Sequence, residues 1–259
     1  MIGNVIKYGA VCAKVRAMRG KCLSAEQWNR LQSCTTVRQV WDILRQSQSW
    51  AGVAQSPEAA ADAQALMAAL GQQLESDCRR LRNYLDDKDT ASMRAFLDMR
   101  SAERSMTPEE YQKWWDGIRT DAALRRLVAA DVDAMNLVYV LRLRKFRASG
   151  QQAAKEMIPI RGQFKPEMAE EILRIESDAA LLEYIRKTRW RDTFRSLEPG
   201  VLERQYREYL TQFCSRIMSS AQPGMAVVQA FLELKDLERR KLSRLIGAVE
   251  RGIDPGLVV

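Results

Sequence analysis

Apolar residues recur every three or four positions along most of the chain, which is the spacing of one face of an α-helix. They form such a stripe in residues 4–19 and again in residues 225–251. Residues 135–141 are apolar on every side, a pattern typical of a helix in a protein interior. The longest helical pattern, residues 57–85, carries leucines near heptad spacing. No segment alternates apolar and polar residues over the length of a strand, so the pattern predicts an all-α fold.

Shorter helices are predicted between these segments. The acidic run at residues 86–89 is predicted to break the long helix before it, and a loop is predicted at residues 158–162, which contain a proline and a glycine. A turn at Pro199 precedes a helix rich in aromatic residues around Tyr209. The other predicted helices span residues 25–32, 37–45, 92–104, 109–118, 122–130 and 131–146.

A helix-start pattern occurs three times, beginning at Leu23, Met106 and Phe164. Each copy places a Glu in the first helical turn. The first two copies supply Ser24 and Thr107 as N-caps, and the second and third place a proline at the first helical position, where its missing N–H costs nothing. A repeated start signal indicates a repeated helical unit.

The copies are also alike beyond this start. A second helix start comes about ten residues later in each copy, and the first and third copies close on Trp50 and Trp190. An acidic residue followed three positions later by a small polar residue occurs at Asp98, Asp133 and Glu233.

The common order of these matches predicts an internal repeat. We expect one domain made of three similar helical units, roughly residues 1–104, 105–147 and 148–259, with helices shared between neighbours.

The chain is basic, with 41 Lys and Arg against 33 Asp and Glu in 259 residues, a formal charge of +8 and a pI near 9.4. This balance favours an anionic partner, and a basic helical repeat protein that binds nucleic acid is one interpretation. The charges are interleaved along the whole length, however, which is also typical of solvated helix faces. Because no run approaches the roughly 20 apolar residues of a membrane span, the chain is expected to be soluble and cytoplasmic.

Little in the sequence points to catalysis, a cofactor or a metal. Histidine is absent, and the five cysteines show no CxxC spacing, so neither a zinc site nor a disulfide framework is indicated. No Walker-type phosphate loop and no dinucleotide-binding glycine motif is present. No catalytic, cofactor-binding or metal-binding residue is therefore predicted, and a scaffold or coupling role is favoured.

Several of these segments resemble one family. Tyr8, the Val15–Met18 stretch and Cys22-Leu23-Ser24 are similar to the opening of the C-type subunit of V/A-type rotary ATPases, the homologue of the eukaryotic d-type subunit. Residues 133–137 and 233–237 resemble the family's acidic-x-x-Asn-Leu helices. Residues 158–162 resemble its isoleucine-proline-glycine-glycine loop, without the first glycine. The likeness runs from Tyr8 to residue 256.

The resemblance implies a pseudo-threefold funnel of three helical bundles at the top of a membrane rotor ring. It implies a subunit of a proton- or sodium-translocating ATPase or ATP synthase that hydrolyses nothing itself. Its expected partners are the central axle subunits, of D and F type, and the proteolipid c-ring, rather than nucleic acid or a second copy of the chain. The expected location is peripheral, on the cytoplasmic side of the membrane. The chain departs from the family pattern at Ser101, where Asn or Asp is usual.

Four arginines are the candidates for partner contacts: Arg16, Arg19, Arg142 and Arg144. They stand at the ends of predicted helices, where charge-assisted contacts with carboxylates on the axle or ring are expected. The alternative is that they pair within the chain, with Asp98, Asp133 or Glu233.

Overall fold

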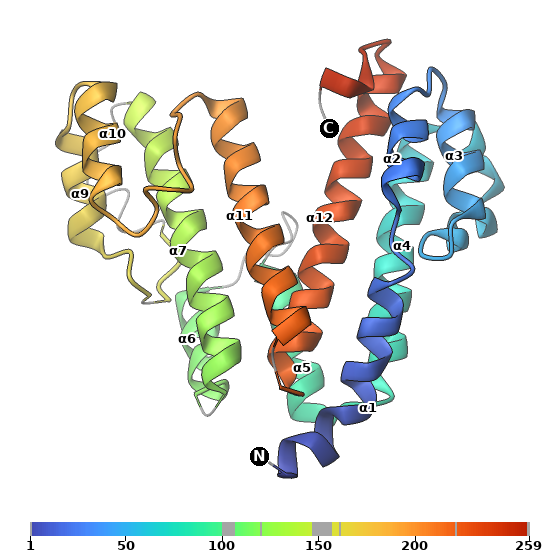
Figure 1. Cartoon of the computed structure of the whole chain (residues 1–259), viewed down its shortest axis with the longest axis horizontal. Coiled ribbons are helices and arrows are strands. Elements are labelled where there is room, and N and C mark those ends of the chain that lie inside the picture. The colour runs from blue at the N-terminus through green and yellow to red at the C-terminus, as the bar shows by residue number, and fades with distance from the viewer. Residues whose placement is uncertain are drawn as a thin grey trace. The chain divides into compact units, whose positions relative to one another are not determined.

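The computed structural model describes residues 2–99, 107–119, 121–146, 157–160, 162–220 and 222–257. Within these ranges the chain forms eleven α-helices and three short 3₁₀ helices, and it contains no strand (Figure 1). The predicted all-α fold is confirmed.

The helices follow one another through mostly short connections. The first are α1 (Ile2–Arg19), α2 (Ala25–Gln32), α3 (Val37–Gln46), η1 (Ala51–Gln55), η2 (Pro57–Ala60), α4 (Ala63–Arg82) and α5 (Asp87–Met99). The remaining ones are α6 (Pro108–Gly117), α7 (Ala122–Lys145), α9 (Pro166–Arg174), α10 (Asp178–Arg186), α11 (Pro199–Ser220), α12 (Met225–Glu250) and η3 (Pro255–Leu257).

The chain divides into two compact units. The first unit combines residues 1–90 with residues 220–259, and the second contains residues 91–219. The first unit therefore joins the two ends of the chain, so that α12 packs with helices more than 130 residues away in sequence. The division into three repeats and their pseudo-threefold arrangement stay predictions.

The repeated helix starts are built as their sequences predict. Ser24 and Thr107 each accept a hydrogen bond from the third residue of the helix, Gln27 and Glu110, whose side chains bond back to the cap. Each pair forms a capping box, which satisfies two backbone donors that the helix itself leaves unpaired. The third copy begins with Pro166 at the first helical position and has no side-chain cap.

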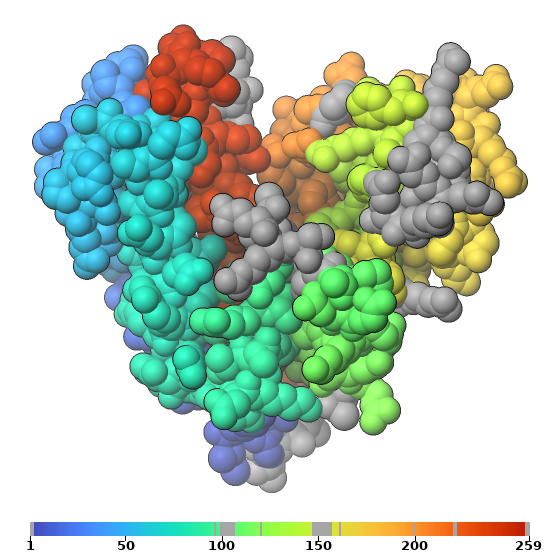
Figure 2. Space-filling view, turned by 180° about the vertical axis from the view of Figure 1, so that it is seen from behind, coloured from blue at the N-terminus to red at the C-terminus, as the bar shows by residue number. Residues whose placement is uncertain are grey.

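A buried apolar cluster of the first unit is formed by α2, α3, the two 3₁₀ helices, α4 and the C-terminal half of α12, and α1 packs against α12 and α4. Figure 1 shows α1 and α4 running alongside α12, and Figure 2 shows the opposite face, where α4 and the segment before it form the surface. Every residue of α12 from Met225 to Glu238 is buried, so this stretch is interior on all sides rather than along one stripe.

The core of the second unit forms around α7, whose C-terminal half packs against α9 and α10. The segment predicted to be interior, residues 135–141, is buried except for two half-buried positions. Phe164 meets Trp190 edge to face, with ring centroids 5.8 Å apart, an arrangement that aromatic pairs favour.

The predicted break between residues 130 and 131 is wrong, because α7 is one continuous helix. Asp131, the first residue of the second predicted helix, is of a type that favours helix N-termini. In the structure Asp131 is buried, and one oxygen of its carboxylate accepts a hydrogen bond of 2.6 Å from the Tyr206 hydroxyl on α11. Asp131 therefore accepts a hydrogen bond from a distant helix and does not begin a new one.

The predicted long helix over residues 57–85 is also wrong at both ends. Asp62 caps α4 by accepting hydrogen bonds from the N–H groups of Gln64 (2.7 Å) and Ala65 (3.2 Å), and η2 precedes it separately. The acidic run at residues 86–89, predicted to break this helix, also takes part in the next one. Asp86 accepts a 2.8 Å hydrogen bond from the Asp89 N–H, so the run begins α5, where negative charge favours the helix dipole.

The start of α4 can be tested at its cap. Asp62→Ala is expected to lower the free energy of unfolding by about 1 kcal/mol, because two backbone donors lose their acceptor. Asp62→Asn keeps an oxygen acceptor at that position and is expected to stay close to wild type. Urea denaturation followed by circular dichroism measures both. An equal loss in the two variants would show that charge, and not capping, is what Asp62 supplies.

Candidate functional site

A buried carboxylate on α7 holds the loop that leads into α9. Asp133 accepts hydrogen bonds from the N–H groups of Gln163 (2.7 Å) and Phe164 (3.1 Å), and its other near neighbour is Arg189 at 3.4 Å. Burial raises the pKa of Asp133, and the two backbone N–H groups and Arg189 oppose that shift. The carboxylate thereby positions the backbone of this loop.

The residue three positions further along α7 holds the beginning of the same loop. The Asn136 side chain donates to the Ile158 carbonyl and accepts from the Ile158 N–H, both at 3.0 Å. At Gly162 a Cβ would come within 2.2 Å of an Asp133 oxygen. A glycine is needed there because the backbone approaches the carboxylate so closely.

A second buried carboxylate does the same work in the first unit. Glu238 on α12 accepts one hydrogen bond from the Leu23 N–H (3.1 Å) and one from the Trp50 indole N–H (2.9 Å). These two residues lie at the beginning and just beyond the end of the α2–α3 segment. One side chain of the interior helix therefore fastens both ends of that segment.

The two carboxylates act on matching positions of the repeat. Leu23 and Phe164 occupy the same place in the helix-start pattern, and the N–H of each is bound by a carboxylate of a long interior helix. Trp50 and Trp190, which close the two copies, are both buried. The sequence repeat thus corresponds to a repeated mode of attachment in the first and third copies.

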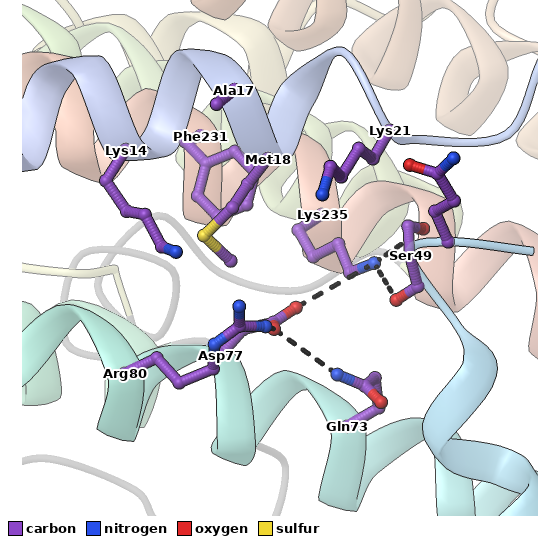
Figure 3. Close-up of a pocket in the computed structure, with 11 residues that line it drawn as sticks. Lys14, Ala17, Met18, Lys21, Ser49, Gln73, Asp77, Arg80, Phe231 and Lys235 are labelled. Atoms are coloured by element: carbon purple, nitrogen blue, oxygen red, sulfur yellow. Dashed lines mark hydrogen bonds and ion pairs between the residues drawn. The ribbon is translucent and has the colours of Figure 1, made fainter.

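A buried lysine lies next to Glu238 in the first unit. Lys235 is 1% exposed, and its ammonium group donates to the Ser49 carbonyl (2.8 Å) and hydroxyl (2.9 Å). It lies 3.6 Å from the centroid of the Trp50 ring and 4.0 Å from Glu238. Asp77 is 3.9 Å away, and Figure 3 shows it facing Lys235 together with Ser49. Burial lowers the pKa of Lys235, an effect that these two carboxylates oppose.

Tyr8, which belongs to the opening motif, joins α1 to the start of α5. Its hydroxyl donates a 2.9 Å hydrogen bond to Asp89, and the neighbouring Lys7 pairs with Asp86 (2.8 Å) and Asp89 (2.6 Å). These two carboxylates raise the pKa of Lys7. The N-terminal helix is thereby held by a charged cluster as well as by apolar packing.

Two of the four predicted arginines lie at the C-terminal end of α7 and have partners within the second unit. Arg142 is half exposed and pairs with Glu203 of α11. Arg144 has a side chain only 13% exposed, and it donates to the Ile175 carbonyl at 2.8 Å and pairs with Asp178. Arg144 therefore fastens α7 to the turn between α9 and α10.

The other two arginines lie at the C-terminal end of α1, in the first unit. Arg16 is exposed and Arg19 is half-buried. Positive charge in the last turn also favours the helix dipole. Two of the four predicted arginines therefore lie at the C-terminal end of α1 and two at that of α7. The Arg144 side chain is largely buried within the second unit.

The carboxylates considered as alternative partners of the arginines are placed differently. Asp133 lies near Arg189, and Glu233 is fully buried on α12. Asp98 is half-buried on α5. Ser101, the departure from the family pattern, lies outside the described residues.

Sequence reasoning missed the most connected polar residues, Lys235 and Glu238. The signal was available, because both charges stand inside the long apolar pattern of α12, where an unpaired charge would cost several kcal/mol. Their partners could not be identified, since Ser49 and Leu23 lie about two hundred positions away and nothing in their local sequence indicates a charged partner.

The described part of the chain shows no grouping of three or more Cys, Asp or Glu side chains placed to hold a metal ion. All five cysteines are free thiols. None of the helices that the structure describes combines the length and apolar character needed to cross a membrane.

These features define an all-α protein whose interior helices use carboxylates to hold the backbone of shorter helical segments. The family model described as ATP synthase (C/AC39) subunit matches residues 11–101 and 111–258. The match covers most of the chain, which therefore belongs to this family of V/A-type ATP synthase C/d subunits. No curated protein sequence matches the chain significantly.

The loop contact at Asp133 yields a stability test. Gly162→Ala is expected to lower the free energy of unfolding by about 1–3 kcal/mol, because the new methyl group must displace a buried carboxylate. Gly71→Ala, on α4 where nothing lies within 4 Å of the added atom, is the matched control and is expected to stabilise by about 0.5–1 kcal/mol. Urea denaturation compares the two. Gly162→Ala behaving like the control would contradict the close approach.

The buried lysine yields a pH test. Between the lowered pKa of Lys235 and the ordinary value of 10.5, the unfolded chain binds a proton that the folded chain does not. The free energy of unfolding of the wild type, measured relative to Lys235→Met, is therefore expected to increase as the pH rises toward 10.5. Denaturation at a series of alkaline pH values provides the difference. A difference that stays constant with pH would mean that Lys235 titrates in the folded chain as it does in water.

Proposed function

We propose that this protein is the non-catalytic subunit that joins the rotor axle to the proteolipid ring of a V/A-type ATPase or ATP synthase. The observation that carries the proposal is the family match along residues 11–101 and 111–258. The axle subunits are those of D and F type, and the coupled ion is a proton or sodium. The subunit transmits torque between ATP turnover and ion movement.

The internal attachments support this role physically. A part that transmits torque must resist deformation, and each unit has a long interior helix that binds shorter segments through buried hydrogen bonds. Asp133 and Asn136 bind the loop before α9, and Glu238 binds both ends of the α2–α3 segment. Hydrogen bonds to buried charged groups contribute about 1.5–3 kcal/mol each, so these segments are costly to displace.

The proposed partner contacts centre on the end of α1. Arg16 is exposed and Arg19 is half-buried, so their guanidinium groups can reach carboxylates of the axle or of the ring loops. Arg142 is half exposed and can exchange Glu203 for a partner carboxylate. Arg144 is proposed to contribute mainly by holding the turn between α9 and α10.

The proposed location is the cytoplasmic side of the membrane, with attachment through the ring. The subunit is proposed to act as a single copy in the complex and not as a homo-oligomer. Its hydrophobic contacts with the bilayer are expected to be few, because the ring supplies the membrane anchor.

Co-purification tests the proposal directly. The tagged chain is expected to retain D- and F-type axle subunits and the c-ring when the complex is extracted in mild detergent at low salt. Retention of neither would contradict the proposal. The basic charge of +8 keeps nucleic-acid binding as the competing function, which predicts DNA or RNA binding that weakens steeply with added salt.

Substitution of the arginines distinguishes contacts with a partner from contacts within the chain. The double variant Arg16→Gln/Arg19→Gln is expected to bind the axle at least tenfold more weakly, with a smaller change in melting temperature than Arg144→Gln. Arg144→Gln is expected to lower the melting temperature, because it removes bonds to Ile175 and Asp178. Pull-down titration and thermal melting measure the two effects.

The matched control is Arg126→Gln/Arg174→Gln, which removes two exposed arginines of the second unit. It is expected to change neither quantity appreciably. If it weakens axle binding as much as the α1 variant does, overall charge and not the end of α1 determines the affinity.

A further inference from the structure

A small basic cavity lies in the first unit, between α1, α4 and α12. Its volume is about 100 Å³, and the segment at Gln48 and Ser49 closes one side. Figure 3 shows Lys14 and Lys21 pointing from the α1 side toward α4, with Asp77 and Arg80 opposite them. The cavity is separate from the arginines discussed above, because neither Arg16 nor Arg19 lines it.

The charges that line the cavity are unbalanced. Four cationic side chains face a single carboxylate, which gives a formal lining charge of +4 − 1 = +3; the cations are Lys14, Lys21, Arg80 and Lys235 and the carboxylate is Asp77. Asp77 is already shared between Arg80, at 3.6 Å, and Lys235, at 3.9 Å, and Lys235 has a further carboxylate, Glu238, at 4.0 Å outside the lining. Within the described part of the chain, no carboxylate lies at ion-pair distance from Lys14 or Lys21.

The wall of the cavity is fixed in place. Lys235 is 1% exposed and is held by two hydrogen bonds to Ser49, so its charge cannot move away to solvent. Asp77 is 3% exposed and accepts from the Gln73 side chain at 3.3 Å. In a partly enclosed site of low dielectric, such fixed charges act more strongly on an anion than the same charges at an open surface.

We propose that this cavity binds an oxyanion of the phosphate class, either free phosphate or the phosphomonoester of a larger molecule. Lys14 and Lys21 are the direct ligands, Arg80 is available from α4, and Lys235 supplies fixed positive charge. A cavity of about 100 Å³ accommodates several water molecules, which is enough for a phosphate group.

Charge and geometry favour phosphate over a carboxylate of a partner protein. A single carboxylate would leave a net lining charge of about +2, whereas a phosphate dianion would leave about +1. Lysine binds phosphate as a point charge from any direction, and cations placed on opposite sides of a cavity suit a tetrahedral anion with oxygens on all sides. This proposal does not depend on the coupling role.

Isothermal titration of the full chain with inorganic phosphate at low ionic strength tests the site. The wild type is expected to bind phosphate, and Lys14→Gln/Lys21→Gln is expected to bind it at least tenfold more weakly, with the binding of both weakening as salt screens the charges. Lys113→Gln/Lys165→Gln removes two exposed lysines of the second unit and is the matched control, expected to bind as the wild type does. Circular dichroism confirms that all variants are folded.

Two further measurements identify the source of the anion and the competing ligand. Sedimentation with vesicles that contain phosphatidic acid, compared with phosphatidylcholine alone, shows whether a lipid phosphate reaches the site; lysine-dependent binding to either source supports the proposal. Titration with acetate provides the comparison with a carboxylate. Binding by the wild type to neither inorganic phosphate nor phosphatidic acid vesicles, equal binding by the Lys14→Gln/Lys21→Gln variant, or acetate binding as tight as phosphate would each overturn it.

Discussion

The structure depends on carboxylates buried on long interior helices that accept hydrogen bonds from the backbone of segments distant in sequence. Removing a carboxylate from water is costly, and the cost is offset only where several donors converge on it. Asp133 and Glu238 meet that condition with two N–H donors each. Because at least one donor to each carboxylate lies at the start of a helix pair, the bonds that satisfy the charge also fix where each pair begins.

This arrangement explains how short helices are held firmly in place. Helices of eight to ten residues such as α2 and α10 are marginal by themselves, because helix formation has a costly nucleus. Here each pair is held at its start by an interior carboxylate and covered by apolar packing at its end, where Trp50 and Trp190 are buried. The proposed coupling role would require such stiffness, since a flexible connection would dissipate torque.

The distribution of positive charge follows from the same construction. Some arginines and lysines pair with nearby carboxylates, as Arg144 does with Asp178 and Lys7 with Asp86. The cations around the basic cavity differ because Asp77 is the only carboxylate that lines it. The excess positive charge that gives the chain its net charge of +8 is therefore not spread evenly. Part of it is concentrated around this partly enclosed cavity.

The sequence by itself determined the helical class, most helix positions and the capping residues, because these depend on neighbours within about four positions. Ser24 and Thr107 were identified as caps, and residues 135–141 as interior, from local pattern alone. The order of weak motifs was also sufficient to indicate the family.

The tertiary structure decided everything that depends on partners far along the chain. Asp131 looked like a helix start and became the acceptor for Tyr206, and Arg144 looked available for a partner and is enclosed by Ile175 and Asp178. Lys235 looked like one more charge on a helix and became part of a buried network. The sequence alone does not show which distant group will pair with a charged side chain, because that pairing is set by the packing of the whole unit.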